Sequence, residues 1–346
     1  MFSTPFVLTF SLLLSLPILF LLAPRILPPR LSSVPISPSD DASATPTTRL
    51  PSSFSHLAAS KPKLKIAFLF LTNSDLQFAP LWEKFFRPPS AKSLYNIYVH
   101  ADPTVNVTSP GGVFEGKFIE HAKRTYRASP TLISATRRLL ATAILDDPAN
   151  AFFAVISQHC IPLHSFKFVY HSLRDPDAST QYGIRLQYKS FIEVISDEPR
   201  LWKRYVARGR YAMMPEVPFE DFRVGSQFFV LTRRHALMVI KDRRLWKKFR
   251  MPCYREDECY PEEHYFPTLL SMQDPKGCTQ YTLTKVNWTG TVNGHPYTYK
   301  KSEISPELIQ GLRESKYSSS YLFARKFAPD CLAPLLKIAD KVIFRD

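Results

Sequence analysis

The first part of the folded region contains three short runs that are apolar almost throughout. They are Lys65 to Leu71 (KIAFLFL), Tyr95 to His100 (YNIYVH) and Ala151 to Ile156 (AFFAVI). Runs of this length without a polar face are typical of strands in a parallel sheet, because helices cover both faces of such a sheet. The pattern therefore predicts three buried strands.

Between these strands, apolar residues recur at helical spacing. Residues 78–86 place bulky side chains on one face, and Ser129-Pro130 is a helix start with serine as the N-cap. The apolar stripe after this pair ends at Asp146-Asp147-Pro148, and residues 166–173 form a further helical segment. The alternation predicts an α/β fold, with a Rossmann-like, mostly parallel sheet flanked by helices. Ligands of such sheets bind beyond the carboxyl ends of the strands.

Residues 1–23 do not follow this pattern, since Pro5 to Ala23 is almost wholly apolar and uncharged. The run is long enough to cross a bilayer. A cleaved signal peptide is the alternative, but the chain has neither a basic n-region nor a clear small-residue cleavage site. Arg25 and Arg30 come after the run, and no Lys or Arg precedes it. The positive-inside rule alone would therefore favour the orientation opposite to that of a type II anchor. We expect a transmembrane signal anchor, embedded in the lipid bilayer through residues 5–23, because the rest of the chain looks lumenal.

Residues 24–62 are rich in Pro, Ser and Thr and lack any apolar period. Such a segment cannot bury enough surface to fold, so we interpret it as a disordered stem. Residues 63–346 are then expected to form the folded domain. Two sequons, at Asn106 and Asn287, agree with a lumenal location but are also expected by chance in a chain of this length.

The formal net charge of +15 narrows the class of partner only slightly. A basic protein suits nucleic acid, an anionic membrane surface or a phosphorylated small molecule. The sequence contains no zinc-finger, RNP-like or homeodomain pattern, so we expect no nucleic-acid partner. Glycine is scarce, with 10 residues, and this argues against a glycine-rich phosphate loop.

Two aspartate positions could carry chemistry. Asp102 follows the second predicted strand, where a carboxylate can accept hydrogen bonds from a nucleoside, although Ala-Asp-Pro is also good turn chemistry. Asp175-Pro176-Asp177 has the Asp-x-Asp spacing with which many sugar transferases hold a divalent metal. It follows a helical segment and not an apolar strand, so we interpret it as a turn.

Two further clusters have both a chemical and a structural interpretation. Glu262-Glu263-His264 could supply a general base or could be a solvated loop, and it lacks the partners of a zinc site. Lys326 lies in a segment where aromatic residues bracket two cations, which could hold a pyrophosphate or form an edge strand. The basic stretch Arg233 to Arg250 suggests a helix with a break and a solvated face.

Seven segments together resemble the core-2/I-branching β-1,6-N-acetylglucosaminyltransferase family, especially its plant branch. They occur in the family's order and span essentially the whole folded domain. Each is weakly diagnostic alone, but the ordered set is specific. The segments are KIAFLFLT (65–72), YVHADP (98–103), ISQHCIPL (156–163), GSQFF (225–229), EEHYFPT (262–268), VNW (286–288) and LFARKF (322–327).

The resemblance implies a GT-A-like fold and an inverting mechanism that needs no metal. It makes Glu263 the catalytic base, and it places Asp102 near the uridine and Trp288 close to the sugar nucleotide. Lys326 matches a cation that takes the place of the metal at the diphosphate, and Arg313 is our choice for a second such cation. Residues 63–346 would then be a glycosyltransferase catalytic domain.

The resemblance also implies the partners and the location. We expect a UDP-sugar donor, a glycan or glycoprotein acceptor, and a single-pass type II protein of the Golgi membrane with a lumenal catalytic domain. The resemblance does not identify the acceptor or the donor sugar, although N-acetylglucosamine is one donor that it suggests. Trp202-Lys203-Arg204-Tyr205 resembles an acceptor-side segment only loosely. The alternative function is a catalytically inactive lumenal sugar-binding or scaffold protein.

The chain departs from the family at two points. Glu262 replaces an aspartate of the family's Asp-Glu-His motif, which is a conservative change. Animal members have more cysteines, so their disulfide pattern cannot be transferred. Five cysteines are present here, and we expect Cys253 and Cys259 to form a disulfide that closes a small acidic loop before Glu263.

Overall fold

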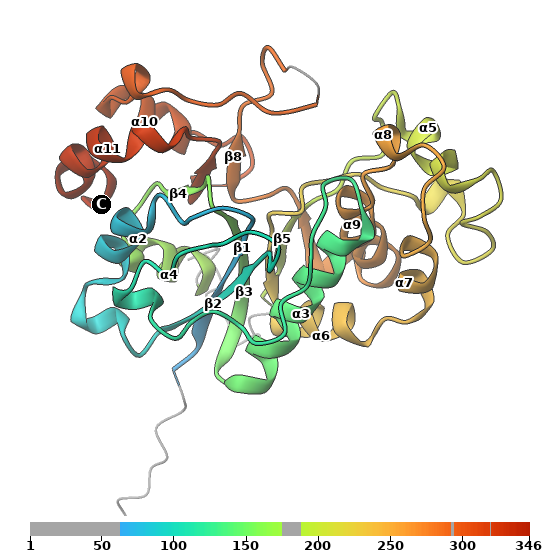
Figure 1. Cartoon of the computed structure of the whole chain (residues 1–346), viewed down its shortest axis with the longest axis horizontal. Helices are drawn as coiled ribbons and strands as arrows, with labels where there is room; N and C mark the ends of the chain where they lie inside the picture. Colours follow the sequence, from blue (N-terminus) through green and yellow to red (C-terminus); the bar gives the residue numbers. More distant parts are fainter. Residues whose placement is uncertain (1–62, 175–187, 292–293, 319) are drawn as a thin grey trace, which may run out of the picture. The chain divides into compact units, whose positions relative to one another are not determined.

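Strand β1 (Lys65–Thr72) is buried over almost its whole length, as its apolar sequence predicts. The computed structural model describes residues 63–174, 188–291, 294–318 and 320–346. In it, β1 pairs in parallel with β2 (Tyr95–Ala101) on one side and with β3 (Asn150–Ser157) on the other (Figure 1). The three predicted strands are therefore present and adjacent.

Three shorter strands extend the sheet to six, in the order β2-β1-β3-β6-β5-β7. Strand β6 (Val230–Thr232) runs antiparallel to both of its neighbours, β3 and β5 (Ser190–Glu193). Strand β7 (Cys278–Gln280) is parallel to β5. The expectation of a mostly parallel sheet is confirmed, with β6 as the reversed strand among those described.

Alternate residues of β1 face two separate hydrophobic clusters. Ile66, Phe68 and Phe70 belong to the first cluster, whereas Ala67 and Leu69 belong to the second. This division follows from the period of two along a strand, which points successive side chains to opposite faces of the sheet. Each face of the sheet therefore has a hydrophobic core of its own.

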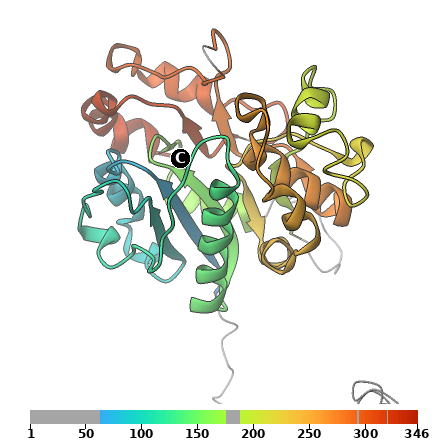
Figure 2. The same ribbon diagram turned by 45° about the vertical axis from the view of Figure 1, so that its right-hand side comes forward.

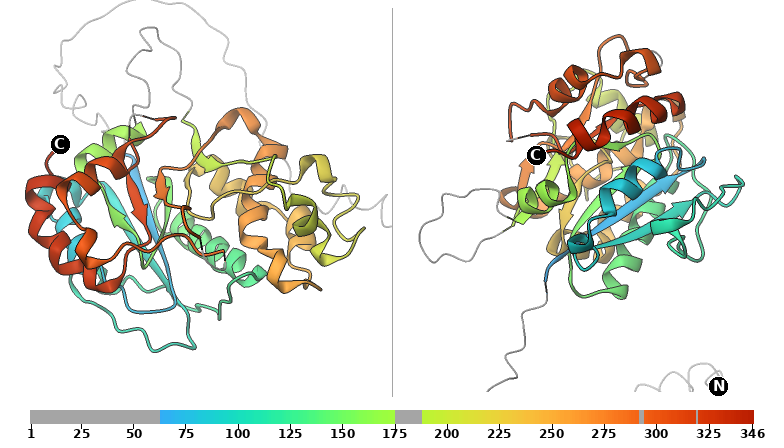
Figure 3. Two further views of the ribbon diagram at one scale, coloured as in Figure 1. Left: turned by 90° about the horizontal axis from the view of Figure 1, so that it is seen from above. Right: turned by 90° about the vertical axis from the view of Figure 1, so that its left-hand side faces the viewer.

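The helices divide between the two clusters. Helices α2 (Ala79–Phe86), α4 (Phe166–Arg174), α10 (Pro306–Arg313) and α11 (Leu332–Ile338) bury side chains in the first cluster. Helices α3 (Pro130–Asp146), α6 (Arg233–Lys241), α7 (Arg244–Phe249) and α9 (Pro261–Gln273) do so in the second. Figures 2 and 3 show the C-terminal helices on one side of the sheet and α3 with α9 on the other. The short helices α5 (Leu201–Tyr205) and α8 (Glu256–Cys259) precede α9.

Two helix boundaries follow directly from local chemistry. The Ser129 hydroxyl accepts a hydrogen bond from the Thr131 amide, so α3 begins where the Ser-Pro pair predicts. The basic stretch breaks at Asp242, because the Asp242 carboxylate accepts hydrogen bonds from the amides of Leu245 and Trp246. Asp242 therefore ends α6 and caps the start of α7.

A second, three-stranded sheet has the order β4-β9-β8 and was not predicted. Strand β9 (Phe323–Arg325) pairs antiparallel with β4 (Ile161–Pro162) and parallel with β8 (Thr284–Val286). Because β8 and β9 are parallel, their carboxyl ends lie at the same edge. The residues that come after them, including Trp288 and Lys326, are brought to that edge together.

The expected disulfide between Cys253 and Cys259 is present. It ties the segment before α8 to the end of that helix, directly ahead of α9. The remaining cysteines, Cys160, Cys278 and Cys331, are buried as free thiols.

Three sequence expectations concern residues outside the described ranges. They are the signal anchor (1–23), the stem (24–62) and the Asp-x-Asp turn (175–177). Within the described part of the chain, no helix is long and apolar enough to cross a membrane.

Removal of residues 1–62 should leave a soluble domain that unfolds in one cooperative transition. Both hydrophobic clusters draw on residues from Ile66 onward, so the truncated protein keeps each core complete. Thermal melting followed by circular dichroism measures this. A matched truncation of residues 1–72 also deletes β1 and should not fold. A non-cooperative melt for the first truncation, with a cooperative one for the full chain, would contradict the predicted domain boundary.

Candidate active site

Two adjoining cavities lie beside the carboxyl ends of the central strands. The first has a volume of about 360 Å³ and is lined by Thr72 and Ser157, the last residues of β1 and β3. The second has a volume of about 780 Å³. Six residues line both cavities: Gln227, Phe228, Glu263, Trp288, Gly294 and Arg325. The first cavity therefore occupies the edge at which parallel sheets bind their ligands.

Three cations line the first cavity. They are Arg127, from the loop before α3, and the neighbours Arg325 and Lys326 at the end of β9. Burial lowers the pKa of Lys326, and the charges of Arg325 and Arg127 lower it further. The Arg325 guanidinium lies over the Phe228 ring, 4.2 Å from its centroid, and burial lowers its pKa as well. Like charges crowded in this way favour an anionic ligand.

Two histidines line the same cavity and remain neutral at neutral pH. Burial lowers the pKa of His159 to about 4, with additional repulsion from Lys326 and Arg325. Burial also lowers the pKa of His295, and Arg127 is the largest of the charges that act on it. These imidazoles therefore offer hydrogen-bonding groups and not further charge.

Glu263 borders both cavities. It lies in the first turn of α9, where a carboxylate interacts favourably with the helix dipole, and Pro261 starts the helix. One carboxylate oxygen, Oε2, accepts a hydrogen bond from the Arg204 guanidinium at 2.7 Å. The side chain of Glu263 remains 31% exposed, compared with 14% for Arg204. Arg204 thus holds one oxygen of Glu263 and leaves the other open to the cavities.

The backbone around Glu263 is fixed by a close approach of Gly225. The Gly225 amide donates to the Glu263 carbonyl at 2.8 Å. A Cβ atom at position 225 would lie 2.0 Å from the backbone oxygen of Glu193, so only glycine fits there without a shift. Glu193 itself lines the second cavity, and burial raises the pKa of its carboxyl group.

The neighbours of Glu263 are not a solvated loop. Glu262 and His264 are 3% and 0% exposed and belong to helix α9. The Ala128 amide donates to Glu262 Oε1, and burial, together with the charge of Glu263, raises the pKa of Glu262 to about 7. Burial lowers the pKa of His264 to about 3, and its Nδ1 donates to the Arg223 carbonyl. His264 is therefore part of the interior behind Glu263, whereas the buried Glu262 still lines the first cavity.

Asp102 lies behind the wall of the first cavity and does not line it. It is 3% exposed, and its two oxygens accept four hydrogen bonds, one each from the amide and the hydroxyl of Thr104 and of Thr125. Thr125 is itself a cavity-lining residue. The contacts make Asp102 a positioning residue for Thr125, and direct contact with a nucleoside stays a prediction.

Arg313 is placed elsewhere, and the expectation of a second diphosphate cation at this position is corrected. Its guanidinium donates to the carbonyls of Leu163, Val342 and Ile343, and Asp346 lies 3.5 Å away. It lines neither cavity and fastens the C-terminal segment to the domain. Arg325 and Arg127, and not Arg313, line the first cavity together with Lys326.

Of the other predicted residues, some line the cavities and some do not. Trp288 lines both cavities and is 54% exposed. Lys203 and Arg204 line the second cavity, whereas Trp202 of the same helix does not. In the described ranges, no group of three or more His, Cys, Asp or Glu residues is placed to hold a metal ion.

Sequence reasoning missed Arg127 and Glu193. Neither lies in one of the segments that carry the family resemblance, and neither is next to a recognisable motif. Arg325 could have been found, because it is the second cation of the segment that contains Lys326.

Two comparisons with known proteins identify the family of this chain. The chain matches the Core-2/I-Branching enzyme family over residues 66–313, which is most of its length. It is 27% identical to Glycosyltransferase BC10 of rice (Oryza sativa subsp. japonica), over 76% of this chain and 73% of that protein. The protein is therefore a glycosyltransferase, an enzyme that acts on a sugar donor and a glycan acceptor. It belongs to the Core-2/I-Branching enzyme family, and the resemblance to the plant branch is confirmed.

Replacement Asp102→Asn should lower the free energy of unfolding by about 2 kcal/mol at neutral pH. Burial would raise the pKa of Asp102, but hydrogen bonds from Thr104 and Thr125 outweigh this and lower it from 3.8 to about 2. A folded-state pKa below the unfolded value contributes stability above about pH 4, and the contribution is lost as the pH falls to about 2.

Denaturant unfolding of the wild type and the variant across this pH range provides the measurement. The difference between them should shrink as the pH falls. A pH-independent difference would show that the charge of Asp102 does not contribute.

Proposed function

We propose that this glycosyltransferase binds a UDP-sugar in the first cavity and a glycan or glycoprotein hydroxyl in the second. The observation that carries the proposal is the position of Glu263, whose carboxylate borders both cavities. A base that removes the acceptor proton has to reach the acceptor oxygen while that oxygen approaches the donor sugar. The boundary between the two cavities meets this requirement.

The charge of the first cavity supports the choice of donor. Lys326, Arg325 and Arg127 surround a space at the carboxyl ends of the strands, and a diphosphate would relieve their mutual repulsion. Fixed cations also stabilise the negative charge that develops on a departing diphosphate. We propose that these three side chains take the role of a divalent metal. Trp288, which is half exposed and lines both cavities, provides an apolar surface next to the transferred sugar.

The chemical step then needs a single base. The acceptor hydroxyl attacks the anomeric carbon from the face opposite the diphosphate, and its proton passes to Glu263 as the bond to the diphosphate breaks. The product has an inverted anomeric centre, and the diphosphate leaves without a proton. Arg204 holds Oε2 of Glu263, so Oε1 is the oxygen that accepts the proton.

The donor sugar and the cellular location belong to the same proposal. N-acetylglucosamine is the first donor to test, because it is the sugar that the family resemblance suggests. We propose that residues 5–23 anchor the protein in the Golgi membrane, with residues 63–346 in the lumen. An inactive sugar-binding or scaffold protein is the alternative, and the replacement of Glu263 separates the two.

Replacement Glu263→Gln should lower sugar transfer by roughly 10²–10⁴-fold, the usual effect of removing a general base. The amide keeps the shape of the side chain but cannot accept the proton. Calorimetric titration with UDP-sugar should give nearly unchanged affinity, because the proposed role lies in the chemical step. Normal turnover by this variant would refute the assignment of the base. A wild-type protein that binds donor without hydrolysis or transfer would favour the scaffold alternative.

Replacement Lys326→Ala is the contrasting case. It removes a cation from the first cavity, so it should weaken UDP-sugar binding as well as turnover. Equal donor affinity in the wild type and this variant would place the diphosphate elsewhere.

Activity should be fully retained in excess EDTA. The reason is that three protein cations already line the cavity in which the diphosphate is proposed to bind. Product formation with and without the chelator, followed by addition of manganese, tests this. Complete loss in EDTA with recovery in manganese would restore Asp175 and Asp177 as the candidate metal ligands.

A further inference from the structure

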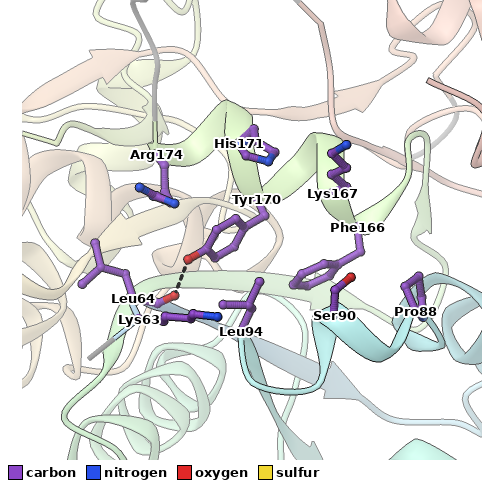
Figure 4. A pocket seen from close by; sticks show the side chains of 10 residues that line it. All are labelled: Lys63, Leu64, Pro88, Ser90, Leu94, Phe166, Lys167, Tyr170, His171 and Arg174. Atoms are coloured by element: carbon purple, nitrogen blue, oxygen red, sulfur yellow. Dashed lines mark hydrogen bonds between the residues drawn. The ribbon is translucent and has the colours of Figure 1, made fainter. Parts of the chain in front are cut away.

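A third cavity, of about 650 Å³, lies at the opposite edge of the sheet (Figure 4). We call it the amino-edge cavity, because its walls come from the segments that lead into β1 and β2 and from one face of α4. Its volume is within the range of sites that bind small molecules. Its lining residues are Lys63, Leu64, Pro88, Ser90, Leu94, Phe166, Lys167, Tyr170, His171 and Arg174. It shares none of them with the two cavities of the active site.

The floor of the amino-edge cavity is apolar and rigidly held. Phe166 and Tyr170 are buried and stack on each other, with ring centroids 6.0 Å apart. Phe166 also contacts Phe85, with ring centroids 5.5 Å apart, and belongs to the first hydrophobic cluster. The Tyr170 hydroxyl donates to the Leu64 carbonyl at 2.9 Å, and this hydrogen bond fixes the opposite wall. The cavity is therefore preformed, and its deepest surface offers packing and not hydrogen bonds.

The rim of the cavity is cationic. Lys63, Lys167 and Arg174 surround the floor, and His171 lies between them on α4. Among the residues that the structure describes, no aspartate or glutamate lines the cavity. Among the described residues, none of the three cations forms an ion pair. The Arg174 guanidinium lies 5.4 Å from the centroid of the Tyr170 ring, so a positive charge of the rim is next to the aromatic floor. Three positive charges above an apolar floor complement a ligand that is apolar at one end and anionic at the other.

We propose that the amino-edge cavity binds one amphipathic anion. Its aromatic or alkyl body packs on Phe166, Tyr170 and Leu94, and its phosphate, sulfate or carboxylate group binds the cations of the rim. A nucleotide sugar does not fit this description, because the floor provides no partners for sugar hydroxyls. The ligand therefore belongs to a different chemical class from the donor, and the inference does not depend on the proposed mechanism.

Binding can be measured with the full-length protein, because Lys63 lines the cavity and a truncation before it would place a new amino terminus there. The probe is 8-anilinonaphthalene-1-sulfonate, an aromatic anion whose fluorescence rises in an apolar site. We expect saturable binding of one probe per chain, displaced by octyl phosphate below its micellar concentration. Excess UDP and inorganic phosphate should not displace it. Displacement by UDP would assign the probe to the active site, and equal displacement by inorganic phosphate would show that the apolar floor is not used. Either result overturns the proposal.

Two variants test whether the ligand binds in the amino-edge cavity. Lys167→Glu reverses a charge at the rim, and Ser90→Phe fills the space from the other wall; both positions are exposed, so neither change disturbs a core. Lys167→Glu should weaken octyl phosphate binding by about tenfold or more, the usual effect of losing a charge-assisted contact. Ser90→Phe should weaken it as well, because the added ring occupies the space of the ligand. Lys241→Glu is the matched control, because it makes the same change at an exposed lysine that lines none of the three cavities.

The control protein should bind like the wild type. Equal affinity in all four proteins would refute the site, provided that their thermal melts agree. A final arm distinguishes a single molecule from a membrane surface. If the protein binds no monomeric octyl phosphate, and its sedimentation with vesicles of phosphatidylcholine and phosphatidic acid falls in Lys167→Glu but not in Lys241→Glu, the cationic rim is a membrane contact and the cavity proposal is wrong.

Discussion

Strand β1 is buried on both faces, and the two hydrophobic clusters of the domain meet on it. Each fully buried aliphatic or aromatic side chain contributes roughly 1.5–3 kcal/mol relative to exposure, so a strand that buries seven of its eight residues is a major source of cohesion. Strand β1 also packs against elements outside the central sheet. The Phe68 ring contacts Phe86 of α2 and Phe323 of the second sheet. The same strand ends at Thr72, on the wall of the first cavity. The stability of the core and the position of the active site thus depend on one element.

Repulsion among the cations of the first cavity destabilises the free protein, and an anionic ligand would reduce this repulsion. Arg127, Arg325 and Lys326 lie close enough for their charges to affect one another, and burial adds to the cost for the last two. A fold optimised for stability alone would separate them. Partial compensation comes from the Phe228 ring, which lies against the Arg325 guanidinium, and from the Glu263 carboxylate, whose charge acts on Arg325. An anion in this cavity would therefore stabilise the folded protein as well as bind to it.

Glu263 is held from three directions by parts of the chain that are distant in sequence. Helix α9 carries it, Gly225 binds its backbone, and Arg204 of α5 orients its carboxylate. Behind it, Glu262 has a pKa near 7 because it is buried next to another carboxyl group. The two adjacent glutamates consequently have different environments, and only Glu263 borders both cavities. Their order in helix α9 decides which of them borders both cavities.

The buried strands, the start of α3, the break between α6 and α7, and the family could all be predicted from the amino-acid sequence. These features rest on period, capping and short motifs, which are local properties of the chain. The family resemblance also singled out Glu263, Trp288 and Lys326, and all three line the first cavity. The tertiary structure decided which charges share the site. Arg204 and Glu263 are 59 residues apart, so their contact depends on how α5 and α9 pack. Arg313 and Arg127 are equivalent in residue type, but one binds carbonyls of the C-terminal segment and the other reaches the first cavity. No local pattern distinguishes them, because the partner of a charge is set by long-range packing.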